Sequence, residues 1–281
     1  MEYEFLYKVI KSMAVSDNMY NIQKVQTAHR IDLAEFWEIK PGMKVLEIGC
    51  GQGDTTAVLS YFVGENGFVN GIDIASGDYG SPITLEQAAA YLKESELGKQ
   101  IKIDFGTDVL SEEIDFPEGY FDIIVLSHCS WYLRSFEELE RILRKAKKWG
   151  EKLCFAEWDT RINSIEQYPH FLAVLIQAHY ECFKTSSYSN VRTLFTPYDI
   201  RSIAEKAGWT IIKEDKISSE DLQDGKWEID IVKNDYKYEI NKIENIPEKL
   251  KELIKSEVDL LKESVSGNEI KSLSTYAFIG C

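Results

Sequence analysis

A glycine-rich turn flanked by carboxylates is the stretch of this sequence with the clearest chemical meaning. Its residues are Glu47, Gly49, Gly51, Gly53 and Asp54. Glycines let the backbone approach a ligand closely and adopt conformations that a Cβ atom would forbid. The carboxylates of Glu47 and Asp54 would repel a pyrophosphate but attract a ligand that carries an ammonium and a sulfonium group. The turn is therefore a candidate site for such a ligand.

The elements around the turn indicate a nucleotide-binding α/β unit. The apolar run at 45–48 predicts a short buried strand, and the apolar spacing over 55–63 predicts a helix. Dinucleotide sites carry Gly-x-Gly-x-x-Gly here, with the pyrophosphate on the helix N-terminus. In this chain Asp54 stands where the last glycine would be, which favours S-adenosylmethionine. The alternatives are that Asp54 is a helix N-cap and that the glycines form an ordinary tight turn.

A second predicted strand, at 67–74, contains an acidic residue at its end. Asp73 lies 20 residues after Gly53, where a carboxylate can bind a ribose diol. With these motifs, residues 41–217 resemble class I S-adenosylmethionine-dependent methyltransferases. The resemblance implies that the acidic-x-Gly-x-Gly-x-Gly turn and Asp73 hold S-adenosylmethionine, with S-adenosylhomocysteine as product. It also implies an α/β fold: a Rossmann-like, doubly wound, mostly parallel seven-stranded sheet with a helical N-terminal cap and a lid insertion.

The resemblance extends the predicted cofactor site to the ends of three strands. Ile74 follows Asp73, and Ser127 ends the fourth strand. Thr107 and Asp108 follow the third predicted strand, at 101–105, where related enzymes place a polar side chain near the adenine amino group. Both are candidates because the segment at 111–115 blurs the register. An ordinary helix-capping aspartate is the alternative for Asp108.

Two side chains are candidates for acid–base chemistry. His128 follows the predicted strand at 123–126, and Glu157 follows the one at 152–156. Ligands of open α/β sheets bind outside the carboxyl ends of the strands, so both should face the cofactor and the acceptor. Methyl transfer requires no metal, but a hydroxyl or ammonium acceptor requires a general base. We predict His128 or Glu157 in that role and no metal; the alternative for Glu157 is a solvated loop residue.

Further residues near these strand ends form the predicted acceptor site. They are Tyr20, His29, Trp131, Tyr132, Tyr180 and Arg192. Tyr20 and His29 lie in or next to a predicted helix at 21–37, which methyltransferases of this kind often fold over the pocket. The alternatives are a packed core histidine for His29 and a surface ion pair for Arg192.

We expect a single methyltransferase domain with four parts. Residues 1–37 form a helical N-terminal cap, 41–159 the cofactor-binding core, 160–196 a helical lid, and 197–281 helices and strands that complete the sheet. The segment at 227–242 is ambiguous. Its first residues alternate like a strand, whereas Val232, Tyr236 and Ile240 recur at helical spacing. We favour a helix.

The composition of the chain limits the classes of partner that it is expected to bind. With 44% hydrophobic and 12% aromatic residues, the 281-residue chain can bury a core and line an aromatic pocket. The 47 acidic against 32 basic residues give a formal charge of −15, which disfavours nucleic acids and anionic membranes. The five cysteines show no zinc-binding spacing, and we see no basic leader or membrane-spanning run. We expect a cytoplasmic protein with a small-molecule substrate, no nucleic acid partner and no stable membrane association, and we leave a homodimer open.

Three other functions remain as alternatives. Cys50 in the glycine turn and the run Ile83-Thr84-Leu85-Glu86-Gln87 resemble motifs of cyclopropane-fatty-acyl-phospholipid synthases. Their Tyr-Ser-Cys-Ala-Tyr-type motif has only a poor match here in Ser130-Trp131-Tyr132, so lipid methylenation is a minority hypothesis. A non-catalytic S-adenosylmethionine-binding protein is the second. A nucleotide-dependent dehydrogenase is the third, and Asp54 disfavours it.

Overall fold

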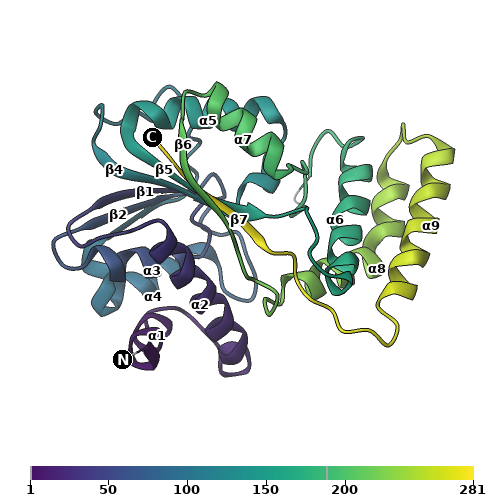
Figure 1. Cartoon of the computed structure of the whole chain (residues 1–281), viewed down its shortest axis with the longest axis horizontal. Coiled ribbons are helices and arrows are strands. Elements are labelled where there is room, and N and C mark those ends of the chain that lie inside the picture. The colour runs from purple at the N-terminus through teal and green to yellow at the C-terminus, as the bar shows by residue number, and fades with distance from the viewer. Residues whose placement is uncertain (1, 188) are drawn as a thin grey trace.

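The computed structural model describes residues 2–187 and 189–281, which form one seven-stranded sheet with helices on both faces (Figure 1). The strand order is β3-β2-β1-β4-β5-β7-β6, and only the pairings of β7 with its two neighbours are antiparallel. This confirms the predicted mostly parallel, Rossmann-like sheet. The strands are β1 (Lys44–Ile48), β2 (Phe68–Ile72), β3 (Ile101–Asp104), β4 (Phe121–Ser127), β5 (Gly150–Trp158), β6 (Ile211–Ile217) and β7 (Thr275–Gly280).

The helices divide into three groups. In Figure 1, α1 to α4 lie below the sheet, α5 and α7 lie above it, and α6, α8 and α9 stand apart to one side. The α-helices are α1 (Glu2–Lys11), α2 (Tyr20–Phe36), α3 (Asp54–Val63), α4 (Leu85–Glu94), α5 (Phe136–Trp149), α6 (Tyr168–Glu181), α7 (Pro197–Lys206), α8 (Asp224–Lys242) and α9 (Glu248–Ser264). Short 3-10 helices lie at Asp17–Met19, Glu96–Gln100, Ser130–Tyr132 and Ile165–Gln167. Helices α1 and α2 both fall in the segment 1–37 that was predicted as a helical cap, although bounds were predicted only for the second of them, at 21–37.

Local sequence signals explain where several helices begin. Thr84 caps α4 and Thr196 caps α7, each in a capping box completed by the third residue of the helix. The Ser135 hydroxyl accepts the Glu138 N–H at the start of α5. Pro197 occupies the first turn of α7, where its missing N–H costs nothing. These caps fix the residues at which the three helices begin.

Strand β5 is longer than the predicted segment at 152–156. It runs from Gly150 to Trp158 because β7 pairs with it up to Trp158, opposite Thr275. That pairing comes from the far end of the chain, so no local pattern marks it. As a result Glu157 lies inside a strand of the sheet, with 1% of its surface exposed.

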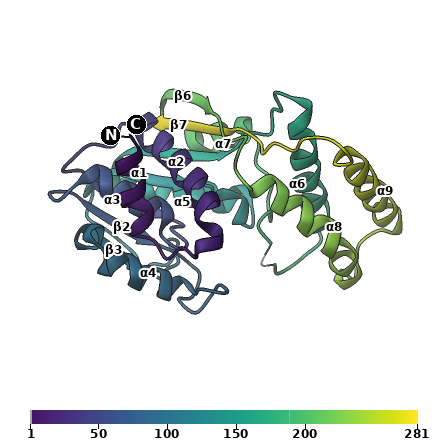
Figure 2. The same ribbon diagram turned by 90° about the horizontal axis from the view of Figure 1, so that it is seen from below.

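Helices α6, α8 and α9 form a unit of their own, which we call the helical unit (Figures 1 and 2). Its core consists of apolar residues of the three helices, including Leu172, Ile176, Tyr180, Ile229, Val232, Tyr236, Ile240, Ile254, Val258 and Leu261. The expected lid covered only 160–196, but α8 and α9 from the C-terminal part also belong to this unit. The ambiguous segment at 227–242 lies in α8, because its helical face is buried against α6 and α9.

Two adjacent leucines of α9 test the packing of the helical unit. Leu261 is fully buried in its core, whereas Leu260 is 51% exposed. We expect Leu261→Ala to lower the free energy of unfolding of this unit by about 2–5 kcal/mol, because the substitution leaves a cavity. Leu260→Ala removes the same atoms from the solvent side and should change it by less than about 0.5 kcal/mol. Urea unfolding of both variants measures the difference, and equal losses would contradict the assigned helix face.

Candidate active site

The glycine turn between β1 and α3 has the conformation that its sequence predicts. Gly49, Gly51 and Gly53 all have positive φ, of 79°, 52° and 89°. A Cβ atom on Gly49 would lie 2.8 Å from Cβ of Cys129, so that position excludes a side chain. No atom lies within 4 Å of the place where a Cβ of Gly51 would be. The turn therefore presents bare backbone to open space.

Asp73 ties the turn to the end of β2. Its Oδ2 accepts the N–H of Gly51 at 2.8 Å, and its Oδ1 accepts the N–H of Ala75 at 2.8 Å. The carboxylate is half-buried, so part of it still faces solvent. The acidic end of the second strand thus stands against the glycine turn, as the motif spacing predicts.

Glu47 lies beneath the turn rather than at its rim. It is a residue of β1 with 2% of its surface exposed, and the Thr56 hydroxyl donates a 2.5 Å hydrogen bond to its Oε2. Burial raises the pKa of Glu47 to about 8. A positively charged group brought next to Glu47 would favour its ionised form.

Asp54 is not the N-cap of α3. Gly53 is the N-cap, in a left-handed conformation, and Asp54 is the first residue of the helix. The N-cap alternative is therefore wrong, because the third glycine takes the position at which the chain turns into the helix. The Asp54 carboxylate faces Arg30 of α2, with Oδ2 3.5 Å from Nη2. Helix α2 is thereby linked to the turn.

The remaining predicted cofactor residues surround the same strand ends. Ile74 is 59% exposed directly after Asp73, and the Thr107 N–H donates to the carbonyl of Asp73 at 2.8 Å. Asp108 accepts the N–H of Leu110 through Oδ1, as in a local turn. Ser127 ends β4, half-buried. An exposed apolar side chain beside a carboxylate and a bare glycine turn fits an adenosine with a charged methionine tail.

His128 lies at the centre of the second half of the site, just after β4. Its φ of 49° is unusual for a residue other than glycine and marks a position held by its surroundings. Its Nε2 is 3.3 Å from Nε2 of His29 and 3.5 Å from the hydroxyl of Thr275. Its Nδ1 is 3.6 Å from Oε1 of Glu157. Elements β4, α2, β7 and β5 all contribute to this cluster.

Glu157 is fully engaged by hydrogen bonds. Its Oε2 accepts from the backbone N–H and the hydroxyl of Ser130 and from the N–H of Trp131, and its Oε1 accepts the N–H of Trp158. The alternative of a solvated loop residue is wrong, because β7 encloses this end of β5. The carboxylate holds the chain after β4 in place and lies beside the His128 ring.

His29 fits both of its interpretations. It is 6% exposed, as a packed histidine would be, and its ring still reaches His128. Burial, and then the nearby His128, lower the pKa of His29 well below its usual value. The His29 side chain is therefore neutral at physiological pH. It also lies 3.2 Å from the Thr275 hydroxyl.

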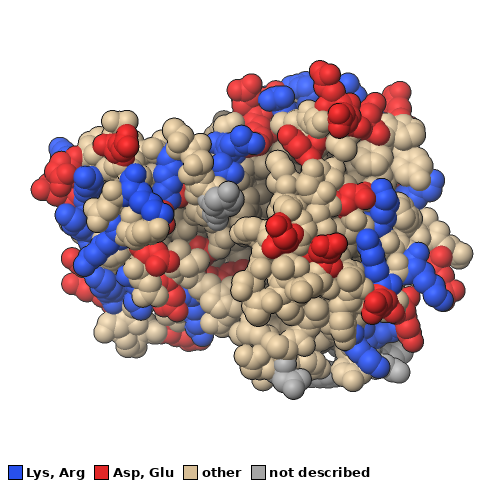
Figure 3. All heavy atoms as spheres, turned by 180° about the vertical axis from the view of Figure 1, so that it is seen from behind, with Lys and Arg blue, Asp and Glu red and all other residues tan. Residues whose placement is uncertain are grey.

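A pocket of about 230 Å³ adjoins His128, between the strand ends and the helical unit. Figure 3 shows the molecule hollowed between its two masses, with acidic atoms at the floor of the hollow. The pocket is lined by His128, Trp131, Tyr132, Glu157, Trp158, His170, Asn190, Val191, Asp224, Trp227 and Glu228. Four catalytic or acceptor candidates of the sequence are among them: His128, Glu157, Trp131 and Tyr132.

Four acceptor candidates lie outside this lining, and one of them is His29, which reaches His128 from behind the pocket wall. Tyr180 is 1% exposed in the core of the helical unit. Tyr20 is 38% exposed at the start of α2. Arg192 is near the rim, where its N–H donates to the carbonyl of Trp131 and its Nη1 to that of Tyr132. Among residues 2–187 and 189–281 Arg192 has no ion pair, so that alternative has no support.

Several lining residues were not predicted from the sequence. They lie in the helical unit, at the end of β5 or in the segment near Asn190. Trp158, His170, Asn190, Asp224, Trp227 and Glu228 are the main ones. Glu228 is buried and accepts hydrogen bonds from Gln177 and Asn190. Asp224 and Glu228 flank Trp227 at helical spacing, but an acidic pair on a helix is usually a solvated face. Only the packing of α8 on α6 turns that face toward the pocket.

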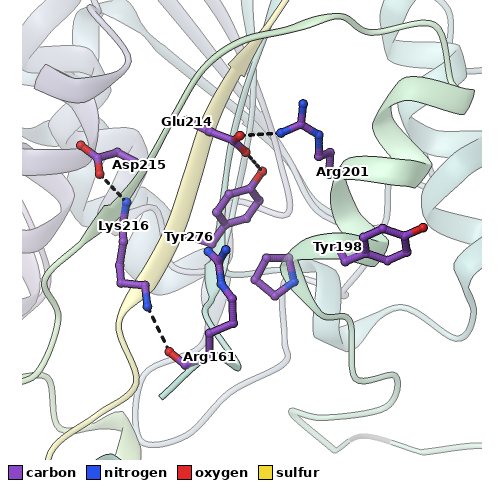
Figure 4. Close-up of a pocket in the computed structure, with 8 residues that line it drawn as sticks. Arg161, Tyr198, Arg201, Glu214, Asp215, Lys216 and Tyr276 are labelled. Carbon is purple, nitrogen blue, oxygen red and sulfur yellow. Dashed lines mark hydrogen bonds and ion pairs between the residues drawn. The ribbon is translucent and has the colours of Figure 1, made fainter. Parts of the chain in front are cut away.

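A larger pocket of about 400 Å³ lies at the other edge of the sheet, beside β6 (Figure 4). Its charged groups are engaged by other groups of the protein, including Asp159, which pairs with both Arg161 and Lys216. Glu214 accepts from Arg201 and from the Tyr276 hydroxyl, and Lys216 donates to the carbonyl of Arg161. Strands β4, β5 and β7 separate β6 from β1. We therefore place the active site at the smaller pocket.

Comparison with known proteins decides the family. A model described as "Methyltransferase domain" matches residues 23–214. The chain belongs to this methyltransferase family. It is of the class I, S-adenosylmethionine-dependent type that the turn and Asp73 indicated, and S-adenosylmethionine is its cofactor. The residues of the turn, with Asp73 and Ile74, fit that cofactor.

Individual relatives of this methyltransferase differ in how much they share. A solved cyclopropane-fatty-acyl-phospholipid synthase-like protein from Lactobacillus casei is 33% identical, covers 100% of this chain and 99% of its own, and superposes with a TM-score of 0.88. The ubiquinone/menaquinone biosynthesis C-methyltransferase UbiE of Vibrio vulnificus is 34% identical over 122 residues, or 42% of each chain. Methyltransferase phomM' of Diaporthe leptostromiformis is 26% identical over 235 residues, 69% of this chain and 60% of its own. The match to UbiE thus spans well under half of that protein.

Among residues 2–187 and 189–281, no helix is long and apolar enough to cross a membrane. No group of three or more His, Cys, Asp or Glu residues in that part of the chain is arranged to hold a metal ion.

Asp73→Asn tests the cofactor half of the site. The amide keeps the shape of the side chain but loses the charge, and it can no longer accept both backbone N–H groups. We expect the affinity for S-adenosylhomocysteine to fall by about ten-fold or more, as for other lost charged hydrogen bonds. Calorimetric titration measures it. Glu65→Gln, at an exposed position after α3, is the control, and an unchanged affinity in Asp73→Asn would show that the assigned register is wrong.

Glu47→Gln tests the buried carboxyl of the cofactor-free protein. The pKa of Glu47 rises from 4.5 to about 8 on folding, so the native protein keeps a proton that the unfolded chain loses. Its contribution to the free energy of unfolding therefore falls as the pH rises through this interval. The variant should lack this loss and be more stable than the wild type at about pH 8, by on the order of a few kcal/mol. Urea unfolding across the interval measures this, and a wild-type-minus-variant difference that stays constant with pH would contradict the assignment.

Proposed function

We propose that this methyltransferase transfers a methyl group to a small-molecule acceptor, at oxygen, nitrogen or carbon, in the pocket beside His128. The observation that carries the proposal is the position of His128. Its ring lines the pocket and lies at the carboxyl end of β4, next to the strand that carries the glycine turn. Bound S-adenosylmethionine supplies a methyl carbon that its sulfonium has already activated. The chain must then hold the acceptor in line and remove a proton where the acceptor carries one.

The surroundings of His128 suit a general base. The carboxylate of Glu157 lies 3.6 Å from Nδ1, so an imidazole that takes a proton from the acceptor has a carboxylate next to it. His29 stays neutral and does not repel that charge. Glu157 acts through His128 and is a positioning residue in this proposal, because its own oxygens already accept four hydrogen bonds.

The pocket contributes to catalysis in two ways, by placing the acceptor and by supplying a base. We assign the larger contribution to the placement. Correct orientation of two reactants is worth up to roughly 7–11 kcal/mol of barrier, whereas a general base typically gives about 10²–10⁴ in rate. The walls of this pocket of about 230 Å³ come from both the sheet ends and the helical unit. That volume is below the 300–1,000 Å³ common for drug-sized ligands, which supports a small acceptor.

Lipid methylenation is the second candidate, because the Lactobacillus casei relative is described as synthase-like. Two features of the pocket speak against it. The pocket is too small for an acyl chain with its headgroup, and its lining contains three carboxyl residues and no Lys or Arg to hold a phosphate. A non-catalytic binding protein would have no use for an unusual backbone conformation at His128.

Two measurements test the proposal. Calorimetric titration with S-adenosylmethionine, S-adenosylhomocysteine and NAD should show micromolar binding of the two sulfur ligands and none of NAD. A screen of small acceptors should then show release of S-adenosylhomocysteine. If the sulfur ligands do not bind, or if they bind and no small acceptor gives turnover, the proposal fails.

His128→Asn tests the base. Asparagine tolerates the left-handed backbone at this position, so the variant should fold and bind S-adenosylhomocysteine like the wild type. We expect turnover of an acceptor that must lose a proton to fall by about 10²–10⁴. His179→Asn is the control, because His179 lies on α6 and pairs with Glu257 of α9, outside the pocket lining. Equal losses in both variants, or none in His128→Asn, would exclude this role.

A further inference from the structure

The pocket beside His128 is acidic. Glu157, Asp224 and Glu228 line it, and no Lys or Arg is among its lining residues. A concave site with one sign of charge raises the local concentration of ligands of the opposite sign. Burial raises the pKa of Glu228, which lowers its share of the negative charge. Glu157 and Asp224 are the other two carboxyl groups of the lining.

Asp224 differs from the other two carboxyl groups in having a free oxygen. Glu157 accepts four hydrogen bonds and Glu228 accepts two, but Oδ2 of Asp224 is buried and has no hydrogen-bond partner among the residues that the structure describes. A buried carboxylate oxygen without a partner is costly. The dipole of α8 explains an acidic residue in its first turn, yet it supplies no donor to this atom. A ligand with positive charge in the pocket would supply one.

Aromatic side chains form the rest of the wall. Trp131, Tyr132, Trp158 and Trp227 line the same pocket. Indole faces attract cations, by about 0.5–2 kcal/mol each, and aromatic walls around a carboxylate are typical of sites for alkylated ammonium groups. Trp227 follows Asp224 by three residues on α8. The carboxylate and this indole therefore share one helix face.

His170 adds a hydrogen-bond donor of fixed direction. Its Nδ1 accepts the N–H of Leu273 at 2.9 Å, which leaves the hydrogen on Nε2, and Nε2 is buried without a partner. Burial lowers the pKa of His170 to about 3, so this neutral form persists at physiological pH. An oxygen atom of the ligand would satisfy this N–H.

We propose that the acceptor of this methyltransferase is a small amine that also carries an oxygen function, with Asp224 as the counter-ion of its cationic nitrogen and His170 as the donor to its oxygen. The inference rests on the proposed function and narrows its acceptor to one class. Asp224 and His170 both belong to the helical unit, whereas His128 belongs to the sheet. The helical unit thus selects the acceptor, and the sheet provides the base. The nitrogen binds as an ammonium and gives one proton to the His128 imidazole. Its freed lone pair then forms the bond to the methyl carbon as the bond between that carbon and sulfur breaks, which leaves S-adenosylhomocysteine.

The first experiment compares two probes of the same shape. Choline carries a quaternary ammonium and a hydroxyl, and 3,3-dimethylbutan-1-ol is its uncharged carbon analogue. Both are titrated by calorimetry into the full chain loaded with S-adenosylhomocysteine. We expect choline to bind at least about ten-fold more tightly. Equal affinities, or tighter binding of the neutral probe, would overturn the proposed class.

The second experiment assigns the charge to Asp224. Asp224→Asn should weaken choline binding by about ten-fold and leave the affinity for the neutral probe unchanged. Asp230→Asn removes one charge from an exposed position of the same helix, where Asp230 faces Lys233, and should leave choline binding unchanged. Equal effects of the two variants would show that choline binding depends only on the overall negative charge of the protein. That result would overturn the role of Asp224.

The affinity for S-adenosylhomocysteine separates this inference from the proposed function. It should be the same in the wild type and in both variants, since neither residue lies at the glycine turn. If the wild type does not bind S-adenosylhomocysteine, the proposed function fails together with the inference. If it binds S-adenosylhomocysteine but neither probe, the inference alone fails.

Discussion

The buried carboxylate of Glu157 is the interaction on which the transfer half of the site depends. Four N–H and O–H donors converge on it, and three of them belong to Ser130 and Trp131, just after β4. A carboxylate can be removed from water only if its oxygens are satisfied in this way. Satisfying them fixes the chain on both sides of the pocket floor, with His128 on one side and Trp131 on the other. The carbonyl of Trp131 then accepts the N–H groups of Arg192 and Thr193, which positions the rim.

Strand β7 encloses this carboxylate. It enters the sheet antiparallel between β5 and β6 and brings Thr275 opposite Trp158, where its hydroxyl meets both His29 and His128. The segment that leads into β7 also donates the Leu273 N–H to His170. One connection between the helical unit and the sheet therefore sets the orientation of two pocket histidines that come from different parts of the fold.

The cofactor half of the site could be predicted from the sequence because a local strand, turn and helix carry it. Residues 47–54 are contiguous, and Asp73 follows at a spacing that one helix and one strand determine. The pocket half could not be predicted, since β4, β5, α6, α8 and the segment near Asn190 build it together. Tyr180 illustrates the limit. It shares α6 with His170, yet one side chain is in the core of the helical unit and the other lines the pocket.

The end of Glu157's strand shows the same limit. Its apolar run predicted 152–156, and pairing with β7, from the far end of the chain, extends it to Trp158. At 227–242 the local pattern was divided, with strand-like alternation at its start and helical spacing of Val232, Tyr236 and Ile240. The helix that we favoured is confirmed, and burial of that face against α6 and α9 explains why the helical pattern prevails.

Consecutive residues of α2 contact the two halves of the site. His29 reaches His128, and Arg30 reaches Asp54 at the start of α3. A rigid helix cannot move one of these contacts without moving the other. Any displacement of α2 by one ligand therefore changes the free energy with which the other ligand binds. Thermodynamic linkage makes that change equal in both directions, so the N-terminal helix is a physical route by which the cofactor and the acceptor can bind cooperatively.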